Sequence, residues 1–291
     1  MANFTPLKNR FLLELDISLS DIPLNGRFLD YGCGSADVAA HLIQKHKLKG
    51  DLLEVDHSSC QLIRENPLFN DCQLYASSDE LPDSSYDLIV LFDVLEHLPQ
   101  PEQVLKSLYN KLSPGGKLAI VIPYRQSTWG WDDDHYGHLR RWSHTELQQA
   151  LESSDFTIIQ MSDPTFPVYG FLRWLMLRLQ NKSQSPHVAV NQNEYLETMR
   201  QRSKESPHNN AWKKPPKLIN YLPWTLINYL TLPFNKMFKG DEIFSLSIKQ
   251  RSVDQCSHCR RKFNYLNFYN SHVLRECPKC HSKHLKNTRD L

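Results

Sequence analysis

The amino terminus lacks the basic segment and following apolar run of a secretory signal, since it begins Met1-Ala-Asn-Phe-Thr-Pro-Leu-Lys8. We therefore expect a cytoplasmic protein. Residues 218–235 carry no charge, but Pro223 and Pro233 interrupt them, which argues against a straight membrane-spanning helix. A mean hydropathy of −0.52 and 40% hydrophobic residues argue against both a disordered chain and a multi-span membrane protein.

The sequence also lacks internal repeats, and its 291 residues are enough for one α/β domain with an additional element. Its charge is unevenly distributed. Residues 1–164 hold 13 Lys/Arg against 24 Asp/Glu, a net charge of −11, whereas residues 165–291 carry +13. This asymmetry either reflects ordinary solvated faces or indicates that the C-terminal part approaches an anionic partner, phospholipid or nucleic acid.

Cysteines are scarce in the acidic half, where Cys33, Cys60 and Cys72 are typical of small core or loop residues. The remaining four follow the spacing Cys-x₂-Cys-x₁₇-Cys-x₂-Cys, which in a cytosolic protein predicts a tetrahedral zinc site rather than disulfides. The predicted ligands are Cys256, Cys259, Cys277 and Cys280. Four thiolates leave no open coordination position, so this zinc would be structural, in a small ribbon that needs the metal to fold.

Short apolar runs alternate with helical stretches over the first 165 residues, which predicts βαβ units and a parallel sheet. The expected strands are 27–31, 51–55, 72–75, 86–92, 117–122 and 156–161, with a last strand at 242–249. The clearest helical stretches are 36–46 and 101–112. The sequence therefore predicts a domain of residues 1–165 plus 241–250, an inserted amphipathic or cap segment of residues 166–240, and a zinc-ribbon-like module of residues 251–291.

The inserted segment contains two apolar, aromatic stretches with basic flanks, separated by a polar, Pro/Ser/Asn-rich linker at 181–216. The aromatic residues are Tyr169, Trp174, Tyr221, Trp224 and Tyr229. The basic residues are Arg173, Arg178, Lys213, Lys214, Lys217, Lys236 and Lys239. Such segments suit a membrane interface, and they equally suit a cap on the sheet or a dimer face.

A glycine turn follows the first expected strand, in the run Phe28-Leu-Asp-Tyr-Gly-Cys-Gly-Ser-Ala-Asp37. Gly32 and Gly34 allow the backbone to pass close to a ligand, and nucleotide-type ligands bind at the carboxyl ends of such strands. Asp56 ends the second expected strand, 22 residues after Gly34. An acidic residue at about that interval reaches the hydroxyl pair of a ribose.

Three further motifs follow in order: Glu80-Leu-Pro82, Tyr86-Asp-Leu-Ile-Val-Leu-Phe-Asp-Val-Leu-Glu-His-Leu98 and Leu112-Ser-Pro-Gly-Gly-Lys-Leu-Ala-Ile-Val-Ile-Pro123. Over residues 24–161 this succession resembles the class I S-adenosylmethionine-dependent methyltransferases, in particular the branch of ubiquinone and menaquinone biosynthesis. The resemblance implies a Rossmann-like, seven-stranded α/β sheet with S-adenosylmethionine as cofactor. A dinucleotide dehydrogenase would instead have a third glycine where this chain has Ala36, and would lack the Leu-Ser-Pro-Gly-Gly element.

The resemblance also assigns cofactor contacts by position. The methionine portion is assigned to Asp30, Gly32, Cys33 and Gly34, the ribose to Asp56, the adenine region to Ser77, Ser78 and Asp79, and the end of the fourth strand to Phe92 and Asp93. In two places the chain departs from the family pattern. Ala36 replaces the third glycine and still permits close packing, whereas Ser77 stands where the family has an acid near the adenine.

Methyl transfer from a sulfonium is an in-line displacement, so the enzyme mainly aligns the acceptor and excludes water. A base is needed only where the acceptor loses a proton. The candidates are His97 after the fourth strand, and His135 and His138 in a segment expected over the open pocket, with Asp134 as orienter and Tyr136 as a wall. The alternative is that these histidines only stabilise a loop or lid. Ser143 and Glu146 form a predicted capping box just beyond them.

The sequence thus predicts an S-adenosylmethionine-dependent methyltransferase acting on a small, glycan or lipid-linked acceptor at the inner face of the membrane. The competing hypothesis is an RNA or protein methyltransferase that uses the basic zinc ribbon for recruitment. A non-catalytic scaffold with the same fold is a third class, disfavoured by the intact Asp30, Gly32, Gly34 and Asp56.

Overall fold

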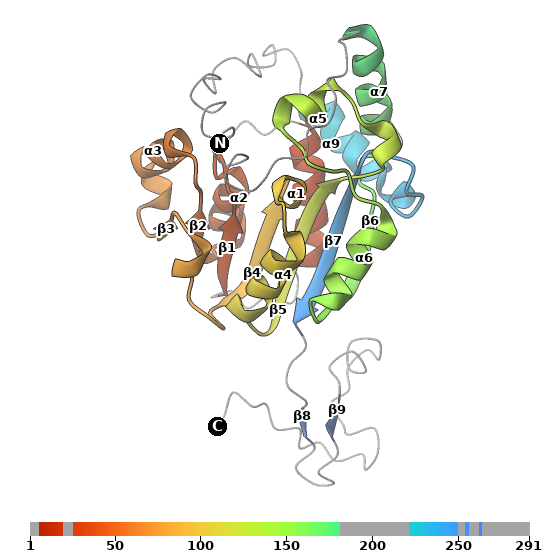
Figure 1. Cartoon of the computed structure of the whole chain (residues 1–291). Helices are drawn as coiled ribbons and strands as arrows, with labels where there is room; N and C mark the ends of the chain where they lie inside the picture. Colours follow the sequence, from red (N-terminus) through yellow and green to blue (C-terminus); the bar gives the residue numbers. More distant parts are fainter. Residues whose placement is uncertain (1–5, 20–25, 181–220, 250–253, 256–261, 264–291) are drawn as a thin grey trace.

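A seven-stranded sheet forms the centre of the molecule, as shown by the computed structural model, which describes residues 6–19, 26–180, 221–249, 254–255 and 262–263 (Figure 1). The strand order is β3-β2-β1-β4-β5-β7-β6. The strands are β1 (Arg27–Tyr31), β2 (Lys49–Leu53), β3 (Leu74–Tyr75), β4 (Tyr86–Phe92), β5 (Leu112–Pro123), β6 (Phe156–Ser162) and β7 (Glu242–Lys249). The Rossmann-like methyltransferase sheet expected from the sequence is therefore confirmed.

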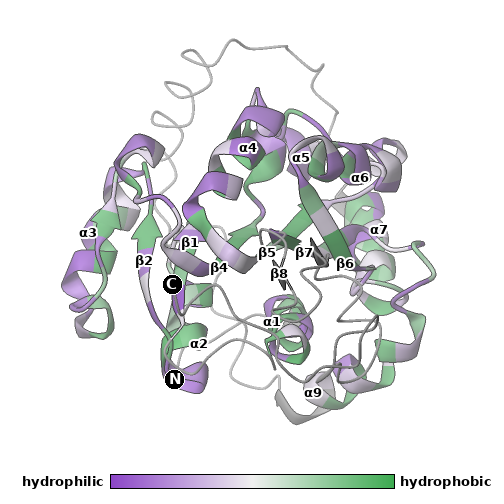
Figure 2. Cartoon of the chain, turned by 90° about the horizontal axis from the view of Figure 1, so that it is seen from below, coloured by the Kyte–Doolittle hydropathy of each residue, from purple (hydrophilic) through white to green (hydrophobic). Residues whose placement is uncertain are grey.

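Helices cover both faces of this sheet, as the view in Figure 2 shows. One face packs against α1 (Pro6–Ser18), α2 (Asp37–His46) and α3 (His57–Glu65), and the other packs against α4 (Pro101–Lys111) and α6 (His144–Ser153). Neighbouring residues of the central strands alternate between the two cores, with Phe28 in the first and Leu29 in the second. Because both faces are covered, the central strands are continuous apolar runs, which is why the sequence predicts β1 and β4 with their observed bounds.

The sheet is mixed rather than wholly parallel, which corrects the expected parallel sheet. Strand β7 lies between β5 and β6 and is antiparallel to both, with Ile120 opposite Ser245 and Met161 opposite the same residue. An antiparallel strand can be reached from its neighbour by a simple reversal, so β6 and β7 need no crossover helix. The chain nevertheless places residues 163–241 between them.

Hydrogen bonds clamp the two ends of this insertion together. The carboxylate of Asp163 accepts hydrogen bonds from the backbone N–H of Gly240 and of Thr165, and the hydroxyl of Thr165 accepts from the N–H of Asp241 at 2.6 Å. Between these ends lie α7 (Val168–Gln180), α9 (Tyr221–Leu230) and the short helix η5 (Leu232–Phe234). The insertion thus leaves and rejoins the sheet at one point.

Helix α1 buries an ion pair in addition to its apolar residues. Arg10 and Glu14 are 2.7 Å apart and almost fully buried, and both contact the side chain of Asn235 beyond α9. Contacts between α1 and α9 therefore fix the second half of the insertion against the core. Within the described part of the chain, no helix is both long and apolar enough to cross a membrane.

The C-terminal cysteines predicted to bind zinc, Cys256, Cys259, Cys277 and Cys280, lie outside the described residues. Two short described strands flank the first pair in the sequence: β8 (Asp254–Gln255) and β9 (Lys262–Phe263). They pair antiparallel, with Asp254 opposite Phe263.

Candidate functional site

The glycine turn after β1 opens onto free space at one position and is tightly packed at another. Gly32 has a φ of +70°, and a Cβ there would lie 2.8 Å from Cγ2 of Val94. Gly34 has a φ of +54°, but a Cβ there would have no atom within 4 Å. Glycine is required at Gly32 by packing and conformation, and Gly34 offers bare backbone to a ligand.

Asp30 lies on β1 beneath this turn and is almost completely buried. Its Oδ2 accepts a hydrogen bond from the N–H of Ala39 in α2 at 3.0 Å. Burial raises the pKa of this carboxyl to about 7, although the hydrogen bond from Ala39 opposes the rise. Ala36 stands at the third glycine position with a φ of 55° and is fully buried, so the left-handed turn is kept without a glycine.

Glu54 is a site residue that the sequence analysis did not select. The carboxylate follows β2 and accepts hydrogen bonds from the backbone N–H groups of Gly34, Val55 and Asp56 at 2.7, 2.7 and 2.8 Å. It therefore joins the glycine turn to the end of β2. In the sequence, the only indication of this role is that Glu54 lies two residues before Asp56. The expected strand 51–55 includes Glu54 as an internal residue, whereas β2 ends at Leu53 and leaves the carboxylate in the following turn.

Asp56 caps helix α3, where its Oδ2 accepts a hydrogen bond from the N–H of Ser59 at 2.8 Å. Ser77, Ser78 and Asp79 follow β3, with Asp79 exposed and its N–H donating to Ser77 Oγ at 3.3 Å.

Phe92 ends β4 with its ring against Phe11 of α1, and the exposed Asp93 follows with a φ of 57°. The structure thus places the residues assigned to the cofactor along the carboxyl ends of four adjacent strands, β3, β2, β1 and β4. This edge is where α/β sheets bind nucleotide-type ligands.

Two of the three candidate catalytic histidines lie together beyond β4. The ring centroids of His97 and His138 are 4.9 Å apart, and both rings lie near the buried carboxylate of Glu96. Burial and the neighbouring His138 lower the pKa of His97 to about 4. Because of this low pKa, His97 stays neutral at ordinary pH. Burial, together with Asp93, raises the pKa of Glu96 well above its ordinary value.

His135 is not part of this cluster. It is exposed on α5 (Trp131–Tyr136), with its ring beside those of Trp131 and Tyr136. The residue that orients His138 is Asp133, not Asp134. Oδ1 of Asp133 lies 2.7 Å from Nδ1 of His138, whereas Asp134 accepts from the indole of Trp129 at 3.2 Å.

Asp133 also belongs to an ion network that ties α5 to the insertion. Arg173 on α7 binds both carboxylate oxygens of Asp132 at 2.8 Å, Asp133 at 2.9 Å and Asp241 at 3.1 Å. Arg141 binds Asp241 at 3.0 and 3.1 Å. Arg173 is thus held inside the protein by ion pairs rather than placed at a solvent or membrane interface. Figure 1 shows α5 and α7 side by side at the same edge of the sheet.

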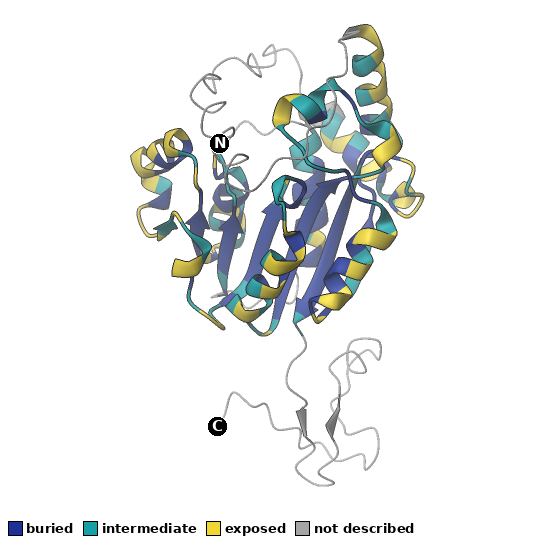
Figure 3. Cartoon of the chain, in the orientation of Figure 1, coloured by how far each residue is buried: buried dark blue, intermediate teal, exposed yellow. Residues whose placement is uncertain are grey.

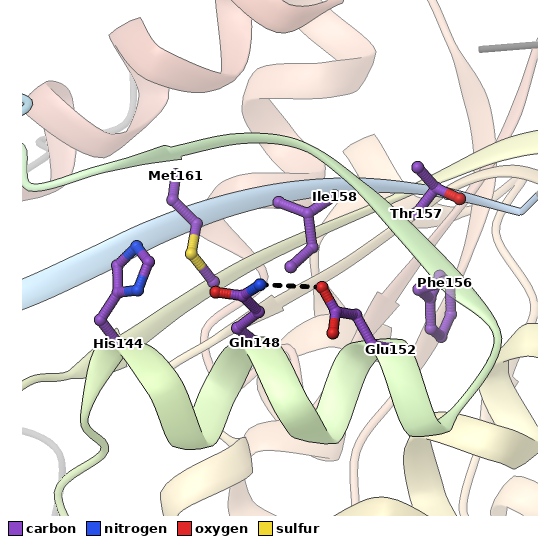
Figure 4. Close-up of a pocket in the computed structure, with 7 residues that line it drawn as sticks. All are labelled: His144, Gln148, Glu152, Phe156, Thr157, Ile158 and Met161. Carbon is purple, nitrogen blue, oxygen red and sulfur yellow. Dashed lines mark hydrogen bonds between the residues drawn. The ribbon is translucent and has the colours of Figure 1, made fainter.

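A separate surface groove lies between α6 and β6, lined by His144, Gln148, Glu152, Phe156, Thr157, Ile158 and Met161 (Figure 4). Along the α6 wall of this groove, Gln148 donates to Glu152 at 2.9 Å. The groove is on the last strand of the sheet, away from the glycine turn of β1. None of the residues predicted to bind the cofactor lines it.

The chain matches the family described as methyltransferase domain over residues 7–161. The chain therefore belongs to this family. The demethylmenaquinone methyltransferase of Listeria welshimeri is 30% identical over 111 residues, 35% of this chain and 47% of that relative. The ubiquinone/menaquinone biosynthesis C-methyltransferase of Rickettsia typhi is 30% identical over 129 residues, 39% and 48% respectively. This chain spans about half the length of these relatives.

Solved structures show the same fold at low identity. Geranyl diphosphate C-methyltransferase from Streptomyces coelicolor A3(2) has a TM-score of 0.52 and 8% identity, covering 83% of this chain and 80% of that one. The cyclase SpnF has a TM-score of 0.52 and 15% identity, covering 82% and 80%. Because a cyclase shares the fold, these similarities define the architecture and leave the acceptor to be argued from the site.

Proposed function

We propose that this protein is an S-adenosylmethionine-dependent methyltransferase that acts on a small, glycan or lipid-linked acceptor, which it meets at the inner face of the membrane. The observation that carries the proposal is the set of exposed apolar side chains on α7 and α9, beside the edge of the sheet that holds the histidine cluster. Figure 3 shows α7 with much of its surface exposed.

Five large apolar side chains make up most of this surface: Phe171, Trp174, Leu179, Leu226 and Leu230, which are between 48% and 75% exposed. A groove at the start of α7 is also apolar, lined by Phe166, Pro167, Val168, Phe171 and Leu172. Several exposed apolar side chains beside an apolar groove favour a lipid or apolar ligand.

Two of the aromatic residues expected at a membrane interface contact other side chains of the insertion instead. Tyr169 is buried and donates to Asn228 at 2.6 Å, and Trp224 stacks on Tyr169 with a centroid distance of 6.0 Å. Trp174 and Tyr229 remain exposed. The proposed membrane contact therefore uses one side of α7 and α9, while the other side holds the insertion on the core.

The energetics favour a weak, reversible contact. Burying one leucine contributes about 1.5–3 kcal/mol, and a basic residue near an anionic surface adds about 1 kcal/mol. Lys236 and Lys239 lie next to this surface in the sequence. Salt weakens only the charged contribution, so binding should decrease with salt without disappearing.

In the reaction, the acceptor attacks the methyl carbon, the carbon–sulfur bond breaks, and its electron pair remains on a neutral thioether. An acceptor oxygen or carbon also loses a proton. His138 is the candidate proton acceptor at this edge, because burial lowers the pKa of His97 and raises that of Glu96. The shared edge would align the cofactor and the acceptor, which is the main requirement of the displacement.

Cosedimentation with phosphatidylcholine vesicles containing phosphatidylglycerol tests the membrane contact. The parent should bind, and Leu226→Glu with Leu230→Glu should weaken binding at least tenfold, because two exposed leucines no longer insert. Leu62→Glu, at a leucine of α3 that is 53% exposed, is the matched control and should bind like the parent. A parent protein that stays in the supernatant at low salt would contradict the membrane contact.

The acceptor class is tested with isotopically labelled S-adenosylmethionine and a cell extract separated into lipid, small-molecule, RNA and protein fractions. Label in the lipid or small-molecule fraction supports the proposal. Label in RNA or protein would support the alternative, in which the basic C-terminal half recruits a macromolecule.

We also propose that Cys256, Cys259, Cys277 and Cys280 bind one structural Zn²⁺. The spacing supports this, and so does the pairing of β8 with β9 on either side of the first cysteine pair in the sequence. Elemental analysis of protein purified without added metal should give about one zinc per chain. Zinc content near zero, or unchanged in Cys277→Ser with Cys280→Ser, would exclude this ligand set.

A further inference from the structure

The carboxylate of Glu96 is completely buried, and among the described residues neither of its oxygens has a hydrogen-bond partner. Buried carboxylates are ordinarily paired with a donor or a cation. Glu96 lies in η3 (Leu95–His97), directly after the end of β4, so this unpaired group is next to the cofactor edge. Both carboxyl oxygens of Glu96 are therefore left available to a ligand.

Two imidazole nitrogens face the same carboxylate oxygen. Nε2 of His138 lies 3.8 Å and Nε2 of His97 lies 4.0 Å from Oε1 of Glu96. These separations are too long for hydrogen bonds, so a shared proton does not account for them. The three ligand atoms all lie within 4.8 Å of one another. An ion with bonds of about 2.0–2.2 Å would place tetrahedral ligands about 3.4 Å apart, so binding would draw the three side chains together.

The second nitrogen of each imidazole is already held. Nδ1 of His138 donates to Asp133 at 2.7 Å, and Nδ1 of His97 donates to the carbonyl of Gly137 at 3.3 Å. A carboxylate and a carbonyl can only accept here, so Nδ1 carries a proton in both rings, and Nε2 is the nitrogen that lies nearest Glu96. Histidines that bind metals in proteins are fixed in this way.

A second cluster shows the opposite arrangement. Asp16 lies 2.7 Å from His41 Nε2, 2.5 Å from Lys45 Nζ and 2.6 Å from His46 Nε2. Its oxygens are satisfied by donors, so it is an ion-pair cluster and needs no metal. Glu96 differs from Asp16 because no donor lies within hydrogen-bond distance of either of its oxygens among the described residues.

We propose that Glu96, His97 and His138 bind a divalent first-row transition-metal ion, with Asp133 and Gly137 fixing the two imidazoles. Two histidines and one carboxylate are a common ligand set for such ions, and three protein ligands leave positions for water or an acceptor oxygen. A bound ion would lower the pKa of an acceptor hydroxyl. That role rests on the proposed methyl transfer, whereas binding of the ion does not.

Titration of the full-length protein with Co²⁺, followed by visible absorption, tests the site. Nitrogen and oxygen ligands give d–d bands without the intense near-ultraviolet charge-transfer bands of thiolates, so the signal is distinct from the cysteine site. We expect one such Co²⁺ per chain. Glu96→Gln and His138→Gln should each weaken it tenfold or more. His135→Gln, a nearby exposed histidine outside the cluster, is the matched control for Co²⁺ affinity.

Binding of S-adenosylmethionine by each variant, measured by calorimetry, shows that the fold is retained. Bands that weaken in both cluster variants and persist in His135→Gln support the site, whether or not a methyl acceptor has been found. Thiolate bands alone, or nitrogen and oxygen bands that remain in both cluster variants, would overturn it.

Discussion

Oδ1 of Asp133 lies 2.7 Å from Nδ1 of His138, and the other oxygen of the same carboxylate binds Arg173 of the insertion at 2.9 Å. One buried carboxylate thus orients a residue of the candidate site and anchors α7. Burial alone would raise the pKa of Asp133, but the hydrogen bond from His138 and the charge of Arg141 hold it below its ordinary value. A displacement of α7 would therefore also displace the carboxylate that orients His138.

Arg173→Met should destabilise the protein by about 3 kcal/mol, because three carboxylates, two of them buried, lose a shared cation. Arg178→Met is the control on the same helix. Its guanidinium lies over the ring of Trp174 at 4.8 Å and is exposed, so its loss should cost less than about 1 kcal/mol. Urea unfolding followed by circular dichroism measures both values. Equal losses in the two variants would show that the ion network does not anchor α7.

Asp56→Ala should weaken S-adenosylmethionine binding tenfold or more, because the ribose loses a charged acceptor, and should also cost about 1 kcal/mol of stability through the lost cap of α3. Asp56→Ser separates the two effects. Serine retains the cap, so this variant should be as stable as the parent while binding the cofactor weakly. If calorimetric titration gave the parent's affinity for S-adenosylmethionine in both variants, Asp56 would not be a residue that binds the cofactor.

Asp30 should make the ligand-free protein less stable as the pH rises. Its pKa is raised by burial from 3.8 to about 7, so the folded state binds the proton more tightly than the unfolded state. Its contribution is complete below about pH 4 and is lost between pH 4 and 7. Asp30→Asn should remove a loss on the order of 3 kcal/mol between pH 5 and 8. Parallel pH profiles of unfolding free energy for parent and variant would contradict this.

Asp16 should have the opposite pH dependence. Burial raises its pKa, but hydrogen bonds from His41, Lys45 and His46 outweigh burial and lower the pKa to about 2. Its contribution is present above pH 4 and is lost as the pH falls towards 2. Asp16→Asn should cost about 1–2 kcal/mol at pH 7, and less at pH 3, in thermal or urea unfolding. Exposed Asp71→Asn should have little effect at either pH.

The sequence predicts the strands better than the first helix, for a physical reason. Strands buried on both faces are apolar runs that end at turns, so β1, β4 and β7 are found with their observed bounds. Helix α1 was not predicted. Arg10 and Glu14 interrupt its apolar pattern, yet both lie in the core as an ion pair. A sequence does not show that two charges will neutralise each other inside the protein.

In the candidate site, too, contacts between residues distant in the sequence could not be predicted. Residues of one local motif, such as Gly32 and Gly34, are found from spacing alone. Pairing Glu96 with His138 depends on a contact across more than 40 residues of sequence. The choice of Asp133 over Asp134 depends on the rotation of a short helix, because only one of two adjacent carboxylates can face His138.

The position of β7 between β5 and β6 has a consequence for synthesis on the ribosome. The chain emerges from its N-terminus, so β5 and β6 are complete long before β7 has been made. Until then β5 has an unpaired edge, and β6 lacks the strand that joins it to the sheet. Nascent chains that end before Glu242 should therefore associate with one another or with chaperones. In the last step of folding, β7 inserts between β5 and β6, which are already synthesised.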